Sequence, residues 1–209
     1  MTLIFGLPRY RAVAEAYIEG LEKRVAQGKP IDSIASVASF FLSRIDTLID
    51  PQLEEIIETD GQKKEMARTA LGEVAISSAR AAYQIYKEIF GSDRFKKLEE
   101  KGARAQRLLW ASTSNKNPNY SDVKYIETLI GNKTVNTVPP QTLDAYRDHG
   151  IPKLRIELET EKAIQVLKSL PELGIDIDQA TQQLEDEGIK KFNEPFDKLM
   201  EALADKSTN

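Results

Sequence analysis

Cysteine is absent from this chain of 209 residues, and histidine occurs only once, at His149. These absences exclude disulfides, thiolate metal sites, a cysteine nucleophile and a metal site built from several histidines. No apolar run approaches the roughly 20 residues that a membrane-spanning helix needs. Acidic side chains outnumber basic ones and give a formal net charge of −4, so no general basic field draws the chain to nucleic acid or anionic lipid.

The remaining composition is that of an ordinary globular protein, with 30% charged and 41% hydrophobic residues. The first residues lack the charged, apolar and small segments of a secretion signal, so we expect a cytoplasmic protein. Four short apolar runs have the length and the flanking residues of β-strands. They are Met1–Phe5, Ile34–Phe41, Gln106–Ser112 and Thr134–Val138.

Helical patterns separate these four strands and continue after the last one. Between and after the strands we predict helices over 10–26, 48–58, 63–90, 95–100, 121–130 and 140–150. Further helices are predicted over 154–170 and 177–187, and a last one starts near Pro195. Alternating strands and helices predict an α/β fold with a parallel sheet and right-handed crossovers. A helical C-terminal section follows it.

The end of the third predicted strand, with the residues that follow it, has the composition of a ligand-binding edge. It reads Ala-Ser-Thr-Ser-Asn-Lys over residues 111–116. Hydroxyl and amide groups can hydrogen-bond an oxyanion, and a lysine supplies the opposite charge. In α/β barrels the substrate groups sit on the loops that follow the strands, so we expect this edge to bind an anionic group.

Several long segments together resemble the transaldolase family, specifically its longer bacterial and cyanobacterial class. The segments occur in the family's order and extend over nearly the whole chain. They are TLIFGLPRYRAVAEAYIEGLE (2–22), SVASFFLSRID (36–46), LLWASTSNKNPNYSDVKYIETLIGNKTVNTVPPQTLDAYRDHG (108–150) and GIDIDQATQQLEDEGIKKFNEPFDKLMEAL (174–203).

The resemblance implies a (β/α)₈ TIM barrel of the class I aldolase type, of which this chain carries four parallel strands with their helices. Residues 1–150 are then a half-barrel with a helical insertion at about 47–102. Residues 151–209 are a helical extension that packs on the barrel. Met1 coincides with the start of the family's fifth barrel strand. The first four strands, with the Schiff-base lysine and two assisting carboxylates, are therefore expected outside this chain, and the N-terminal half of the barrel is an expected partner.

The family's reaction transfers a dihydroxyacetone unit between sugar phosphates through a lysine Schiff base, in the pentose phosphate pathway, and it needs no metal or organic cofactor. Lysine suits this reaction because a desolvated amine attacks the ketose carbonyl and the resulting iminium accepts electrons. The implied substrates are fructose 6-phosphate, sedoheptulose 7-phosphate, erythrose 4-phosphate and glyceraldehyde 3-phosphate. Neither nucleic acid nor a membrane is expected as a partner.

Five residues of this chain match positions near the family's reaction centre. Thr2 matches a threonine that helps to order water or substrate. Ser39, Arg44 and Ser112 match residues of the substrate and phosphate region. Lys116 lies near the place where shorter family members carry a second arginine, which is a looser match. An arginine fork with hydroxyl groups suits a phosphate dianion, so these side chains are the candidate phosphate site.

Structural alternatives stand beside these assignments. Arg44 could be a surface arginine paired with Asp46 or Asp50, and Lys116 could be a solvated lysine in a polar turn. The serine at 39 could bond only the backbone inside its strand, and the threonine at 2 could be an ordinary β-branched strand residue. Trp110 could belong to the core or line the pocket.

The function also has alternatives. The chain could be a non-catalytic remnant or interaction scaffold of transaldolase origin, whose insertion and C-terminal helices form a binding surface. It could also belong to an aldolase that acts on free dihydroxyacetone. Neither Lys133, at the entry end of its strand, nor Lys116, on a wet loop, is placed to replace the absent nucleophile.

Overall fold

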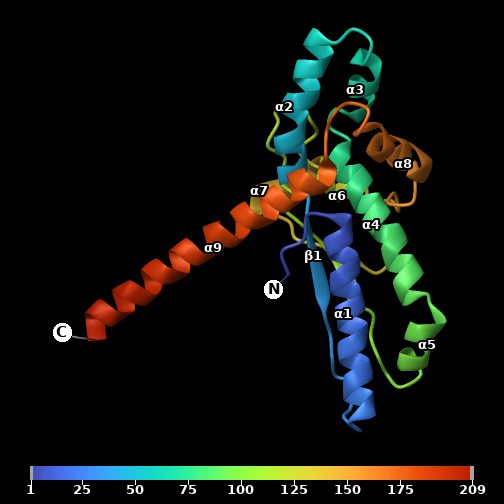
Figure 1. Cartoon of the computed structure of the whole chain (residues 1–209), viewed down its shortest axis with the longest axis vertical. Coiled ribbons are helices and arrows are strands. Elements are labelled where there is room, and N and C mark those ends of the chain that lie inside the picture. Colours follow the sequence, from blue (N-terminus) through green and yellow to red (C-terminus); the bar gives the residue numbers. More distant parts are fainter. Residues whose placement is uncertain (1, 208–209) are drawn as a thin grey trace.

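The structure is a computed structural model that describes residues 2–207 (Figure 1). Within that range the chain forms three strands and nine helices, none of them long and apolar enough to cross a bilayer. The strands are β1 (Val37–Phe41), β2 (Arg107–Ala111) and β3 (Thr134–Asn136). The helices are α1 (Leu7–Ala26), α2 (Ser43–Thr59), α3 (Lys64–Ala70), α4 (Val74–Phe90), α5 (Asp93–Glu99), α6 (Lys124–Glu127), α7 (Pro140–His149), α8 (Thr160–Ser169) and α9 (Ile177–Ser207).

The three strands form a parallel sheet in the order β1-β2-β3, which follows the order of the chain. Ser39 lies opposite Leu109, and Leu109 lies opposite Val135. The first predicted strand is reduced to a parallel bridge between Ile4 and Phe40, beside β1, while Met1 lies outside the described residues. The alternation of strands and helices therefore correctly predicted an α/β fold with parallel neighbours.

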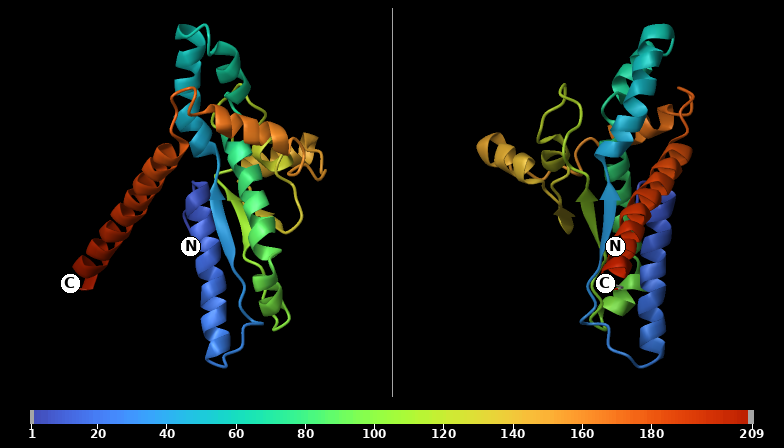
Figure 2. Two further views of the ribbon diagram at one scale, coloured as in Figure 1. Left: turned by 45° about the vertical axis from the view of Figure 1, so that its right-hand side comes forward. Right: turned by 90° about the vertical axis from the view of Figure 1, so that its left-hand side faces the viewer.

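The two faces of the sheet differ in burial. On one face Phe40, Leu108 and Trp110 are fully buried. Tyr10 of α1 packs edge-on against Phe40, with ring centroids 6.4 Å apart, and α4 packs beside α1. On the other face Leu109 and its neighbours on β1 are only half-buried. Figure 2 shows α1 beside the strands. The prediction that Trp110 belongs to the core is confirmed. The sheet therefore has one closed face and one half-open face.

The prediction of one helix over 63–90 is wrong, because α3 and α4 are separate helices. Between them Gly72 has φ +71°, in the left-handed region that glycine adopts without steric penalty. A Cβ at this position would lie 2.6 Å from the Tyr120 ring, so only glycine allows the close approach. The helix predicted from residue 154 starts instead at Thr160, after Glu159 with φ 53°.

The two helices predicted over 177–187 and from Pro195 are one continuous helix, α9, which contains Pro195. Proline removes one backbone hydrogen bond, and a carbonyl freed in an exposed helix can bond to water instead. Figure 1 shows α9 leaving the body as a long rod. Near its first half, a Cβ at Gly188 would lie 2.7 Å from the Leu3 side chain, so α9 passes directly over the N-terminal segment.

Candidate functional site

The carboxyl ends of β1 and β2 are held together beyond the last strand residues. The backbone N–H of Leu42 donates to the carbonyl of Ala111 at 3.0 Å, and that of Ser43 donates to the carbonyl of Ser112 at 3.0 Å. The hydroxyls of Ser43 and Ser112 are hydrogen-bonded at 2.9 Å. Ser112 has φ 54°, an unusual conformation for a residue other than glycine, and such strain is concentrated at functional sites.

Arg44 is the second residue of α2, whose N-terminus begins at this same edge. Its side chain is half-buried and makes no hydrogen bond or ion pair with the residues that the structure describes. The Ser43 and Ile45 N–H groups at the start of α2 already donate to the carbonyls of Ser112 and Leu42, so the helix contributes chiefly the partial positive charge of its N-terminus, which favours an anion. Arg44 therefore adds a full charge to an edge that is already suited to an oxyanion.

Thr2 lies beside Ser39, which is the middle residue of β1. The Ser39 backbone N–H donates to Thr2 Oγ1 at 2.7 Å. Ser39 is half-buried, on the half-open face of the sheet with Leu109, and no hydrogen bond of its hydroxyl to a described residue is found. The structure thus places Thr2 beside the middle of β1, while Ser112 directly follows the end of the neighbouring strand β2.

Lys116 is exposed on the loop after β2 and lines a small cavity of about 240 Å³ together with Ser43 and Asn115. Asn115 fixes this loop, because its amide donates to the carbonyls of Asn117 and Tyr120, both at 2.7 Å. The loop therefore has a defined shape. It brings Lys116 to the Ser43 side of α2, while no contact between Lys116 and Arg44 is found among the described residues.

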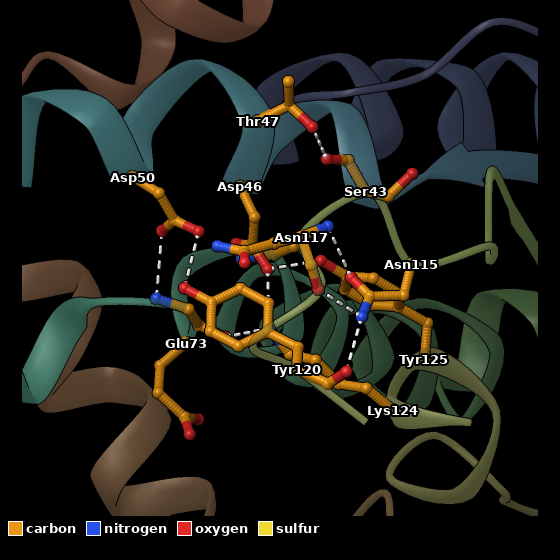
Figure 3. Close-up of polar contacts among 12 residues, drawn as sticks. Ser43, Asp46, Thr47, Asp50, Glu73, Asn115, Asn117, Tyr120, Lys124 and Tyr125 are labelled. Carbon is orange, nitrogen blue, oxygen red and sulfur yellow. Dashed lines mark hydrogen bonds and ion pairs between the residues drawn. The ribbon is translucent and has the colours of Figure 1, made fainter. Parts of the chain in front are cut away.

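A buried polar network lies behind this edge (Figure 3). Asp46 of α2 accepts hydrogen bonds from the Ala75 N–H at 2.8 Å, the Tyr125 hydroxyl at 2.6 Å and the Lys124 ammonium at 2.9 Å. The side chains of Asp46 and Lys124 are only 3% and 12% exposed, so this ion pair is largely removed from water. Lys124 also donates to the Gly72 carbonyl.

Asp50, one turn further along α2, is held differently. Its carboxylate accepts from the Gly72 N–H at 2.9 Å and from the Tyr120 hydroxyl at 2.8 Å, and it has no cation within ion-pair distance among the described residues. Burial, followed by the nearby charge of Asp46, raises the pKa of Asp50 to about 6. Burial and the Asp50 carboxylate raise the pKa of Tyr120 as well.

The chain matches the family Transaldolase/Fructose-6-phosphate aldolase over residues 1–203. It is 51% identical to a transaldolase of Trichodesmium erythraeum over 99% of this chain and 55% of that protein. It is also 48% identical to Transaldolase 2 of a Nostoc species, again over 99% and 55%, and 45% identical to a transaldolase of Mycolicibacterium smegmatis over 97% and 53%. The chain belongs to the transaldolase/fructose-6-phosphate aldolase family. It spans about half the length of these relatives.

For this member of the transaldolase family, sequence reasoning missed the buried network. The pairing of Arg44 with Asp46 or Asp50 is ruled out, because Asp46 pairs with Lys124 and Asp50 bonds Tyr120. One signal was available. The two aspartates are one helical turn apart, among apolar positions of α2 that are all fully buried: Ile45, Ile49 and Leu53. Carboxylates on a buried helix face need partners.

Proposed function

We propose that this chain supplies the phosphate-binding part of a transaldolase site. The observation that carries the proposal is Arg44 at the start of α2, without a hydrogen bond or ion pair to a described residue, next to the Ser43–Ser112 hydroxyl bond at the carboxyl edge of the parallel sheet. This edge is where barrel enzymes bind substrate. Ser39, in the middle of β1, is proposed to reach the same ligand from the half-open face of the sheet. A bidentate guanidinium, two hydroxyls and the start of α2 form a suitable receptor for a sugar phosphate. Two further residues flank the proposed phosphate site. Thr2 lies on the side of the proposed reaction centre, and Lys116 lies on the solvent side.

The proposed architecture is half of a (β/α)₈ barrel. Three observations support it: the strands are parallel, their spatial order is the chain order, and only one face of the sheet is closed. A barrel needs further strands to close, and open edges favour pairing with another segment. We therefore propose that the half-open face covers the barrel interior. Residues 1–150 with an insertion at 47–102 form the half-barrel, and residues 151–209 form the extension.

The proposed reaction uses a lysine outside these 209 residues. The lysine amine adds to the ketose carbonyl and loses water, and the iminium accepts the electron pair when the bond to the leaving aldose breaks. The acceptor aldehyde then forms the new bond, and water releases the product. Within this chain the buried Lys124 is occupied by Asp46, and Lys116 is exposed. We further propose that the reaction takes place in the cytoplasm, as a step of the pentose phosphate pathway. Its substrates are the four sugar phosphates named above.

Borohydride trapping with fructose 6-phosphate tests the location of the lysine. The chain alone should give no covalent adduct. Mixing it with a polypeptide that spans the unmatched part of the Trichodesmium transaldolase should restore an adduct, and mass spectrometry should find it on that added polypeptide. An adduct on this chain alone would show that our placement of the nucleophile is wrong.

A second candidate is an interaction scaffold, which one feature of α9 favours. Its outer half exposes large apolar side chains that are 47–61% accessible, namely Ile189, Phe196, Leu199, Met200 and Leu203. Apolar side chains clustered on a helix mark a docking surface. The trapping experiment separates the two functions. A scaffold would bind the added polypeptide without restoring the adduct, whereas a transaldolase half would do both.

A further inference from the structure

The amino end of the sheet carries a second cavity, far larger than the one beside Lys116. Its volume is about 800 Å³, within the range of small-molecule sites. It lies where β1 and β2 begin, beside the C-terminus of α4 and the helix α5. Figure 1 shows α5 and the start of β1 at the same lower end of the molecule. The candidate phosphate site is at the opposite end of the strands.

The floor of this cavity is aromatic. Tyr86 and Phe90 of α4 and Phe95 of α5 all line it and are less than 9% exposed. The Tyr86 and Phe90 ring centroids are 5.1 Å apart, and Phe90 meets Phe95 edge-on at 5.0 Å. Such a continuous set of rings offers stacking and edge contacts to a flat apolar group.

The rim of the cavity is cationic. Arg104, Arg107 and Lys133 line it and are exposed, whereas Glu99 is its one lining carboxylate. Among the arginines, only Arg44, Arg104 and Arg107 make no side-chain hydrogen bond or ion pair with residues that the structure describes. Two of these three therefore gather at one cavity, in a chain whose net charge is negative.

A buried polar side chain beside the cavity is also incompletely bonded. Gln106 is 4% exposed, and its amide nitrogen donates to the hydroxyl of Ser36, which lines the cavity, at 2.8 Å. Its Oε1 has no hydrogen-bond partner among the described residues. Buried polar atoms are normally satisfied, so Gln106 retains an unused acceptor close to the Ser36 side of the cavity.

We infer that this cavity is a second ligand site, for a small molecule that joins an aromatic ring to a phosphate or carboxylate group. The ring lies on Tyr86 and Phe90, and the anion is bound by Arg104 and Arg107 at the rim. Arginine is suited to this role because its planar fork binds oxyanions bidentately. The inference is independent of the proposed function, since no residue is shared between the two sites.

Isothermal titration with 1-naphthyl phosphate tests this site, with 1-naphthol and inorganic phosphate as matched probes. The intact chain should bind 1-naphthyl phosphate at least about tenfold more tightly than either half-probe. Arg104→Gln and Arg107→Gln should each weaken binding roughly five- to tenfold. Phe90→Leu, which keeps an apolar side chain of smaller volume, should weaken it by losing the ring. Arg68→Gln removes an exposed arginine of α3 and should change nothing.

Three results would overturn the inference. The first is equal, weak binding of all three probes. The second is binding that Arg44→Ala abolishes while the Arg104→Gln/Arg107→Gln double variant does not, which would move the ligand to the candidate phosphate site. The third is loss of binding when the complementary barrel half is added, which would make the cavity a packing surface. The rim variants change exposed side chains, so thermal melts should match that of the unsubstituted chain.

Discussion

The two ends of the parallel sheet hold their charges in different ways. At the carboxyl end Asp46 and Lys124 are paired, hydrogen-bonded and largely removed from water. At the amino end Arg104 and Arg107 stand exposed at the rim of an aromatic cavity, without carboxylate partners among the described residues. The first arrangement fixes the backbone around a site, because removing one charge leaves the other buried. The second leaves charges available to a ligand, and their removal costs little stability.

The largest expected effect is at the carboxyl end. Lys124→Met should lower the free energy of unfolding by about 3–5 kcal/mol, because it leaves the buried Asp46 carboxylate without its cation. Urea unfolding measures the loss. The double variant Asp46→Asn/Lys124→Met removes both charges and should recover part of it. If the single and double variants are equally unstable, the ion pair is not what Lys124 contributes.

The neighbouring carboxylate should respond to pH. The pKa of Asp50 is raised from 3.8 to about 6, so the folded chain retains a proton that the unfolded chain has lost. Its contribution to stability is therefore complete below about pH 4 and disappears as the pH rises through about 6. Asp50→Asn imitates the protonated form. It should match the parent at pH 4 and exceed it by about 1–3 kcal/mol at pH 7.5. A difference independent of pH would contradict this assignment.

Arg44 should affect substrate binding more than stability. In the reconstituted enzyme, Arg44→Ala should raise KM for fructose 6-phosphate about tenfold or more, because a charge-assisted contact with the phosphate is lost. The KM for unphosphorylated fructose should not change. Arg147→Ala, on the exposed face of α7, is the matched control. An unchanged KM for the phosphorylated sugar would remove Arg44 from the phosphate site.

The smallest effect is expected at the strained serine. Ser112→Gly relieves the positive φ but loses the hydroxyl bond to Ser43, so the free energy of unfolding should change by less than about 1 kcal/mol. Ser112→Ala loses the same bond and keeps the strain. It should therefore be less stable than the glycine variant by roughly 1 kcal/mol. Equal stability of the two would show that the backbone at this position is not strained.

The sequence predicted those parts of the fold that depend on neighbouring residues. Apolar runs located β1, β2 and β3 to within a few residues, and the alternation with helices gave their parallel order. The break at Gly72 was missed because a single glycine is tolerated in a helical pattern. Here the helix breaks because the Tyr120 ring, which is distant in sequence, lies against Gly72.

In the candidate site, too, some features could be predicted from the sequence and others could not. Ser39, Arg44 and Ser112 were named from the family resemblance; Arg44 and Ser112 lie near the carboxyl ends of β1 and β2, Ser39 lies in the middle of β1, and their role in phosphate binding stays a prediction. The partner of Asp46 could not be named, because Lys124 lies 78 positions away and carries no local signal. Spacing along a helix shows that a carboxylate faces inward, but only the folded chain shows which cation meets it.

The crossing of α9 over Leu3, made possible by Gly188, has a consequence for the order of folding. A ribosome releases Leu3 long before Gly188, so α9 can cover the segment around Leu3 only after Gly188 has emerged. Pulse-labelling of nascent chains of increasing length should therefore show that Leu3 and its neighbours gain protection only in chains that extend beyond Gly188.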